Sequence, residues 1–251
     1  MHLPDGIVSA TPLTIGLSLA GLAGVAVASK ESRFRRAGDM AWTGTIAAFV
    51  LAIQAVNVPL VPGASAHAIG ATLAVLTLGP ARAVLALFAV LLIQALLFAD
   101  GGVTALGINA LTIAVLPVLA VEAFRRLFAG LPRGLELAAV TGSLVGNLAA
   151  ATLLSLALVD GAAAPLALTA SWLIGVHALS GVIEGVLTAI AVRRLGVRAP
   201  ALLERTETTA AARGSYRVAA VAVVVVLALL PFASNAPDAL QVVLSQLQAE
   251  P

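Results

Sequence analysis

The chain has 251 residues, of which 61% are hydrophobic and only 10% are charged, and its formal net charge is +2 at pH 7. Soluble domains average about 25% charged residues, so this composition excludes an ordinary water-soluble fold and indicates a lipid bilayer as the surroundings. The absence of cysteine excludes disulfides and thiolate metal sites, which leaves nitrogen and oxygen as metal donors.

Apolar runs of about 17–25 residues predict membrane-spanning helices, and this chain contains eight candidates separated by charged residues, glycine or proline. The third candidate is short and rich in small residues, and a polar stretch precedes the last one. The eight predicted spans cover residues 11–29, 40–57, 64–78, 83–99, 104–124, 135–159, 166–192 and about 218–230.

The positive charges predict the orientation of these spans. All 14 Lys and Arg residues fall on one side of the eight-span arrangement, so they are markers of topology and do not indicate a nucleic-acid partner. Because cytoplasmic loops are enriched in Lys and Arg, that side is predicted to be cytoplasmic and both termini extracytoplasmic. The loops on the opposite side are neutral or acidic, which suits a cation that arrives from outside.

The first six residues, Met1-His2-Leu3-Pro4-Asp5-Gly6, predict a metal chelate. Three nitrogens are close together: the α-amine of Met1, the backbone nitrogen of His2 and the imidazole of His2. Five- and six-membered rings through these atoms give a nearly planar array, which suits Ni(II), Cu(II) or a constrained Co(II). Pro4 and the Asp5-Gly6 pair favour an extended segment and a turn, so we expect a fixed hook and not a helix. The chelate requires a chain that starts at Met1, and methionine before a bulky histidine is normally retained.

The other two histidines are His67 and His177. His67 lies at the outer start of the third predicted span among small residues, which let another peptide approach closely. We predict that it is a fourth nitrogen donor, although a helix-start histidine facing water or lipid headgroups fits the same position. His177 lies one turn into the seventh span, with Glu184 seven residues later on the same helical face. For His177 we predict a packing or outer-shell role, and for Glu184 an arginine or a subunit as partner.

Two further polar residues are candidates to support a metal site. Asn109, at the outer start of the fifth span, can orient a metal-bound imidazole through its amide, a role that is common around metal centres. Ser65 stands two positions before His67 in the same small-residue segment. Both are predicted to support the ligands without binding the metal themselves.

Two functions of other classes fit parts of the sequence. His177 and Ser180 share a helix, and Ser180-Gly181 loosely matches a hydrolase nucleophile turn, but two catalytic partners three residues apart on one helix rarely align. An ion-coupled secondary carrier needs membrane-embedded acids, for which Glu184 alone is thin support. The chain contains no Gly-x-x-x-x-Gly-Lys-[Ser/Thr] motif, so we expect nucleotide chemistry to come from separate subunits.

Four parts of the sequence carry a family resemblance when taken in order: the first six residues, 62–67 with 78–80, 94–109 and 178–188. Together they resemble the substrate-binding membrane component of cobalt and nickel energy-coupling-factor (ECF) transporters, the CbiM/NikM type. The likeness covers about residues 1–195 and implies an all-α polytopic membrane protein with a seven-helix core. We expect residues 196–215 to form a cytoplasmic linker, and residues 216–251 an additional transmembrane helix with an external tail.

The resemblance implies that Met1, His2 and His67 hold the metal, which are the donors chosen above from their chemistry. It also implies Ni(II) or Co(II) as cargo, no prosthetic group, a transmembrane coupling subunit and two cytoplasmic ATPases. Asp100 departs from the family pattern, because many relatives have histidine there. Residues 231–240 resemble the family's small helper segment with its Pro-Asp-Gly-Leu-Glu signature, here altered at Ala239 and Gln241, and residues 238–249 predict a short amphipathic helix.

Overall fold

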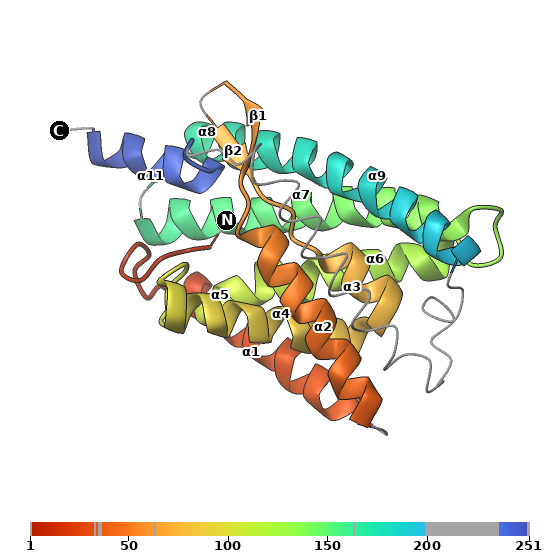
Figure 1. The fold of residues 1–251 in the computed structure, drawn as a ribbon. Helices are drawn as coiled ribbons and strands as arrows, with labels where there is room; N and C mark the ends of the chain where they lie inside the picture. The colour runs from red at the N-terminus through yellow and green to blue at the C-terminus, as the bar shows by residue number, and fades with distance from the viewer. Residues whose placement is uncertain are drawn as a thin grey trace.

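The computed structural model describes residues 2–32, 34, 37–62, 64–162, 164–198 and 236–249. Within these residues the chain is almost entirely helical, with one small hairpin of two antiparallel strands (Figure 1). The elements are α1 (Pro12–Glu31), α2 (Ala37–Gln54), β1 (Val58–Val61), β2 (Ala64–Ala66), α3 (Ala71–Leu78), α4 (Pro80–Ile93), η1 (Gln94–Phe98), α5 (Leu106–Asn109), η2 (Ala110–Val115), α6 (Leu116–Leu127), α7 (Gly134–Ala162), α8 (Leu166–Thr169), η3 (Ala170–Ile174), α9 (Gly175–Arg198) and α11 (Ala239–Ala249), where η marks a π-helical segment.

Five of the described helical segments are long and apolar enough to cross a bilayer. They confirm the first, fourth, fifth, sixth and seventh predicted spans, and α2 matches the second. Helix α1 begins directly after Thr11, whose hydroxyl accepts from the Thr14 backbone nitrogen, and Pro12 occupies its first turn. The eighth predicted span, at about 218–230, lies outside the described residues. The five segments are Pro12–Glu31, Pro80–Phe98, Leu106–Leu127, Gly134–Ala162 and Leu166–Arg194.

The third predicted span is not one continuous helix, and this expectation was wrong. Its first residues form β2, which pairs with β1, and α3 begins only at Ala71. An eight-residue helix is about 12 Å long, well short of the roughly 30 Å hydrocarbon core. His67 therefore does not start a helix, but lies in an irregular connection of residues 67–70 between β2 and α3.

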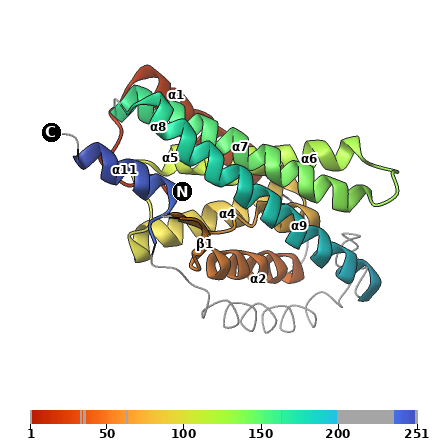
Figure 2. The same ribbon diagram turned by 90° about the horizontal axis from the view of Figure 1, so that it is seen from above.

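Small residues determine how closely the later helices approach one another. A Cβ added at Gly142 or Gly146 of α7 would lie within 3 Å of α6 backbone atoms, and one added at Gly185 of α9 would lie 2.7 Å from a Cα of α7. Such close contacts are typical of helix pairs in membranes. Figure 2 shows α7 and α9 running alongside each other. This packing directs one face of α9, which carries His177 and Glu184, into the protein, where both side chains are buried.

The carboxy-terminal helix α11 packs against β2 and η3 at the end of the molecule where the chain begins (Figure 1). The backbone nitrogen of Ser65 donates to the carbonyl of Pro237 at 2.9 Å, and Ser65 and Asp238 form an isolated parallel bridge. Leu240 and Val243 of α11 are buried in the hydrophobic core. The helix predicted at 238–249 is therefore present, and it begins beside the strand that leads to His67.

Candidate metal site

The segment that precedes α1 is held by the loop between η1 and α5. Leu3 is fully buried, its backbone nitrogen donates to Asn109 Oδ1 at 2.9 Å, and its carbonyl accepts from Asn109 Nδ2 at 3.0 Å and from the Gly102 nitrogen at 2.8 Å. Both backbone polar groups of Leu3 thus have hydrogen-bond partners, as they would in a β-sheet. Asn109 was expected to orient an imidazole; instead its amide positions the residue that follows His2.

Asp5 anchors the same segment a second time. Its carboxylate accepts from the backbone nitrogens of Val103 at 3.1 Å and Thr104 at 2.7 Å, and from the Thr104 hydroxyl. The hydrogen bonds from Thr104 hold the pKa of Asp5 below its usual value. A Cβ at Gly102 would collide with the backbone nitrogen of Asp5, so only glycine allows this approach. The predicted hook is therefore a non-helical segment fixed at residues 3 and 5.

This anchoring brings His2 next to His67. The two rings stack with their centroids 5.2 Å apart and an interplanar angle of 22°, and the His2 side chain is buried. Two metal–nitrogen bonds of about 2.0–2.1 Å span roughly 4 Å at most. The centroid separation of 5.2 Å is somewhat larger than this span, so the rings are neighbours that become candidates to share one ion.

The two nitrogens of His2 have different surroundings. Nδ1 lies 2.9 Å from Oδ1 of Asp100, whereas Nε2 is buried and has no hydrogen-bond partner in the described part of the chain. The planar chelate requires Nδ1, because only that nitrogen closes a six-membered ring with the backbone nitrogen of the same residue. A half-turn about the Cβ–Cγ bond exchanges Nδ1 with Cδ2, so it would take Nδ1 away from Asp100 and free it for the chelate.

Both imidazoles are neutral at physiological pH. Burial lowers the pKa of His2 below its usual value, and burial lowers the pKa of His67 to about 3. The hydrogen bond from His2 lowers the pKa of Asp100, which is therefore ionised. Metal ions bind the neutral form of imidazole, so neither ring must lose a positive charge before it can act as a ligand.

The connection that carries His67 forms hydrogen bonds with side chains on two sides. Oε2 of Glu184 accepts from the Ile69 nitrogen at 2.8 Å and Oε1 accepts from the Gly70 nitrogen at 3.1 Å. On the other side, Nε2 of Gln54 donates to the Ile69 carbonyl at 2.7 Å. Glu184 was expected to pair with an arginine or a partner subunit; in the structure its carboxylate accepts from these backbone nitrogens. Sequence reasoning missed this role, since no local pattern connects α9 to residues 67–70.

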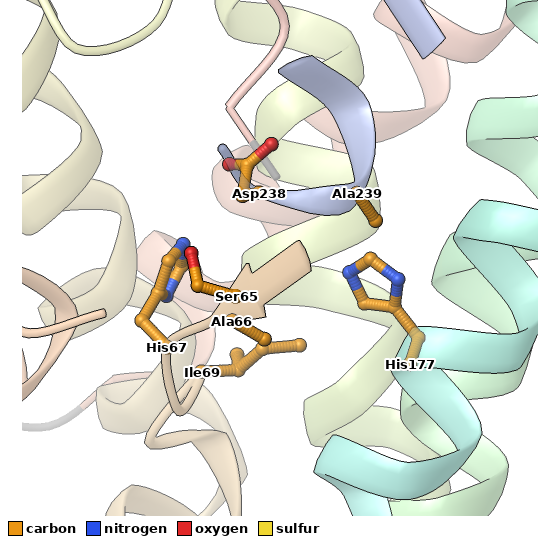
Figure 3. A pocket seen from close by; sticks show the side chains of 7 residues that line it. All are labelled: Ser65, Ala66, His67, Ile69, His177, Asp238 and Ala239. Carbon is orange, nitrogen blue, oxygen red and sulfur yellow. The ribbon is translucent and has the colours of Figure 1, made fainter. Parts of the chain in front are cut away.

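A small pocket lies beside His67, with His177 on its opposite side (Figure 3). Nδ1 of His177 lies 2.6 Å from the Leu173 carbonyl, and the Ser65 hydroxyl donates to the Ala236 carbonyl at 2.6 Å. His177 and Ser65, both predicted to have roles around the ligands, thus line this pocket, and each side chain is bonded to a backbone carbonyl. The pocket is lined by Ser65, Ala66, His67, Ile69, His177, Asp238 and Ala239.

Side chains alone do not form a metal centre among the described residues, where no group of three or more His, Cys, Asp or Glu is placed to hold an ion. A site built on His2 and His67 therefore needs backbone or terminal nitrogens to complete it. Met1, which supplies the third predicted donor residue, lies outside the described residues.

π-helical segments interrupt three of the long helices close to these residues. η1 ends two residues before Asp100, η2 begins directly after Asn109, and η3 ends three residues before His177. π-helical turns are rare and occur often at functional sites, because the extra residue changes the direction of the side chains that follow. Their positions associate these interruptions of the helices with the candidate site.

Ser180 does not form a nucleophile–base pair with His177 in the described residues. Its hydroxyl lies 3.3 Å from both the Asn147 side-chain oxygen and the His177 backbone carbonyl, while Nδ1 of His177 faces the Leu173 carbonyl. A catalytic serine requires a ring nitrogen within hydrogen-bond reach. This geometry gives the hydrolase interpretation no support.

The fold and the site together define a multi-pass α-helical membrane protein with two neutral, stacked imidazoles beside an anchored amino-terminal segment. Residues 2–202 match the family model CbiM, described as the cobalt uptake substrate-specific transmembrane region. The chain belongs to the CbiM family, whose members are membrane components of cobalt and nickel transport systems.

Individual relatives agree with this family. The chain is 38% identical over 200 residues to a Haloquadratum walsbyi protein named for metal transport, covering 75% of this chain and 87% of the relative. It is 38% identical over 127 residues to the fused nickel transport protein NikMN of Rhodobacter capsulatus, covering 49% of this chain and 36% of that protein. The crystal structure of a truncated transition metal transporter superposes with a TM-score of 0.67 at 30% identity, covering 79% of this chain and 99% of that one.

Proposed function

We propose that this protein captures Ni(II) or Co(II) on the extracytoplasmic side and passes the ion inward. The proposed donors are the imidazoles of His2 and His67, the backbone nitrogen of His2 and, in a chain that starts at Met1, the α-amine of Met1. Four nitrogens replace the water that the ion loses when it enters the protein. The ion is cargo and not a resident cofactor.

The observation that carries this proposal is the stacking of the buried His2 ring on the partly buried His67 ring. The two neutral rings lie 5.2 Å apart and come from segments 65 residues apart in the chain. Uncharged imidazoles are good ligands for Ni(II) and Co(II). The hydrogen bonds of Leu3 and Asp5 support it further, because they fix the short segment to which the remaining nitrogens belong.

We propose further that the chain is the substrate-binding subunit of an ATP-driven ECF transporter. It would act with a transmembrane coupling subunit and two cytoplasmic ATPases, with both of its own termini outside. Family membership and the absence of a Walker-type motif in the sequence support this assignment. An ion-coupled secondary carrier remains the alternative.

Metal binding by the purified protein tests the site. The chain, produced with Met1 as its first residue, is titrated with Ni(II) and Co(II) and examined for bound metal and for the absorption spectrum of the complex. We expect one ion per chain and, for Ni(II), the spectrum of planar four-nitrogen ligation. Binding of several weakly held ions, or a spectrum typical of six oxygen donors, would contradict the proposed donor set.

Uptake tests the coupling. Cells that produce the protein with its proposed coupling and ATPase subunits are expected to accumulate radioactive nickel or cobalt, and cells with an inactivated ATPase are not. Uptake that persists without ATPase activity and collapses when the proton or sodium gradient is removed would favour the secondary carrier.

A further inference from the structure

The irregular connection at residues 67–70 requires partners for its backbone. Polar backbone groups that lie outside regular helices within a membrane protein must be satisfied by other parts of the protein. Glu184 accepts from the nitrogens of Ile69 and Gly70, and Gln54 donates to the carbonyl of Ile69. Gln54 is itself held, since its Oε1 accepts from Gln94 Nε2 at 2.9 Å. The residues directly after His67 are therefore held between α9 on one side and α2 with η1 on the other.

Packing leaves this connection little room to move. Gly70 adopts a φ of +81°, and a Cβ added there would lie 2.9 Å from Cγ2 of Val50 in α2. On the side of α9, a Cβ added at Gly185, next to Glu184, would lie 2.7 Å from Cα of Val140. The helix that carries Glu184 thus packs closely on α7, and the connection that donates hydrogen bonds to Glu184 packs closely on α2.

Burial of the Glu184 carboxyl group next to this connection is energetically unfavourable. Glu184 is only 6% exposed and lies in a membrane-spanning helix, where an ionisable side chain is expensive and is usually kept for a function. Its two oxygens together accept from two successive backbone nitrogens, which a side chain with one acceptor atom does not match. The neighbouring polar face of α9 also reaches the site, because His177 lines the pocket beside His67.

We propose that Glu184 is a positioning residue of the metal site, which holds the Ile69–Gly70 turn and thereby places the imidazole of His67. Glu184 does not contact the ion; it acts through the backbone that carries a ligand. This inference rests on the proposed function, in which His67 is a metal donor.

The test is the substitution Glu184→Gln with Ni(II) as the probe. Glutamine has nearly the same shape, but it has one acceptor oxygen, and its NH₂ group meets the second backbone N–H donor to donor. Removal of a supporting partner of a metal ligand typically costs about 10–100-fold in affinity. We expect a loss in that range and a shift of the Ni(II) absorption spectrum towards that of His67→Ala.

Glu122→Gln is the matched control. Glu122 is also 6% exposed, but its carboxylate pairs with Arg125 and Arg126 of its own helix, α6. We expect its Ni(II) affinity to stay within about twofold of the parent, the scatter normal for independent sites. A purely structural role for Glu184 would lower the melting temperature of both variants and leave the Ni(II) spectrum of the folded protein unchanged.

A double-mutant cycle shows whether Glu184 acts through His67. Once His67→Ala has removed the ligand, adding Glu184→Gln is expected to change the remaining affinity by less than about twofold. An additive loss in the double variant would overturn the proposal. Gln54→Leu loosens the same turn from the opposite side, so it is expected to weaken binding in the same non-additive way, and it serves as the test if Glu184→Gln does not fold.

These variants distinguish a failure of the proposed donor set from a failure of the positioning role of Glu184. If His67→Ala binds Ni(II) as well as the parent, the donor set of the proposed function is wrong. If His67→Ala loses binding while Glu184→Gln and Gln54→Leu both stay within about twofold of the parent, the donor set stands and the positioning role is overturned.

Discussion

Nδ1 of His2 donates a hydrogen bond to Oδ1 of Asp100 at 2.9 Å, across 98 residues of sequence. The direction of the bond follows from the charges, because the pKa of Asp100 is lowered and an ionised carboxylate can only accept. The His2 side chain is 2% exposed and the Asp100 side chain 52% exposed, so a buried ring is bonded to an acid that reaches water. Metal-bound histidines usually have a hydrogen-bond partner of this kind, so Asp100 is a candidate to support His2 in the metal-bound protein.

Asp100→Ala is predicted to weaken Ni(II) binding by about tenfold, at the lower end of the range for lost supporting partners because Asp100 is half-exposed. Asp100→Asn keeps an acceptor oxygen and is expected to lose less. Competition titration against a chromophoric chelator measures both affinities. Asp160→Asn serves as the control, since Asp160 is bonded to Thr11, away from both histidines; an equal loss there would show a general charge effect.

His67→Ala is predicted to reduce Ni(II) affinity by more than about 100-fold, beyond the effect of an outer partner, while the protein still folds. His177→Ala is predicted to cost less than about tenfold, because the His177 ring lies across the pocket and its Nδ1 bonds the Leu173 carbonyl. Equilibrium dialysis with radioactive nickel compares the two variants. Comparable losses would make His177 a ligand.

A change at the first atom of the chain is predicted to disrupt the site. Acetylation, or one added residue, converts the Met1 amine into an amide and removes one donor together with its chelate ring. We expect the loss of most of the Ni(II) affinity, whereas a carboxy-terminal tag is expected to have no effect. Metal content of the purified forms measures this. Stoichiometric metal in the extended protein would eliminate the amine as a ligand.

Gly102→Ala is predicted to displace the amino-terminal segment, since the new Cβ would overlap the backbone nitrogen of Asp5. Asp5→Asn removes the charge that accepts from Val103 and Thr104 and is expected to loosen the same segment less severely. Both variants should bind Ni(II) more weakly and show faster cleavage of residues 2–10 by added protease. Gly16→Ala is a suitable control, because a Cβ there meets no atom within 4 Å.

Acid is predicted to destabilise the metal-free protein through His67. Its pKa is about 3 in the folded protein and 6.5 in the unfolded chain, so between these values the unfolded chain binds a proton that the folded protein does not. The stabilising contribution is therefore complete above pH 6.5 and declines by up to about 1.4 kcal/mol for each pH unit below it. The decrease in melting temperature from pH 7.5 to pH 5.5 is expected to be smaller for His67→Gln than for the parent. His2 titrates in the same direction, which leaves a residual decline in the variant.

Much of this protein could be predicted from the sequence because bilayer helices are recognised by local composition. A helix satisfies its own backbone, so an apolar run of sufficient length predicts a span without knowledge of its neighbours. The pairing of His2 with His67 was predicted for a similar reason: few residues in the chain offer nitrogen donors, and small residues beside His67 allow close approach.

Only the tertiary structure decided how residues 64–70 are built and what holds the site. Their composition predicted a helix, but they form a strand and an irregular connection whose nitrogens bond Glu184, 115 residues away for Ile69. In the same way Asn109 bonds Leu3 across 106 residues, where an imidazole was expected. In each case a distant side chain bonds backbone groups that lie outside regular secondary structure and have no local partner. The periodicity and composition of a single segment do not predict a partner so distant in sequence.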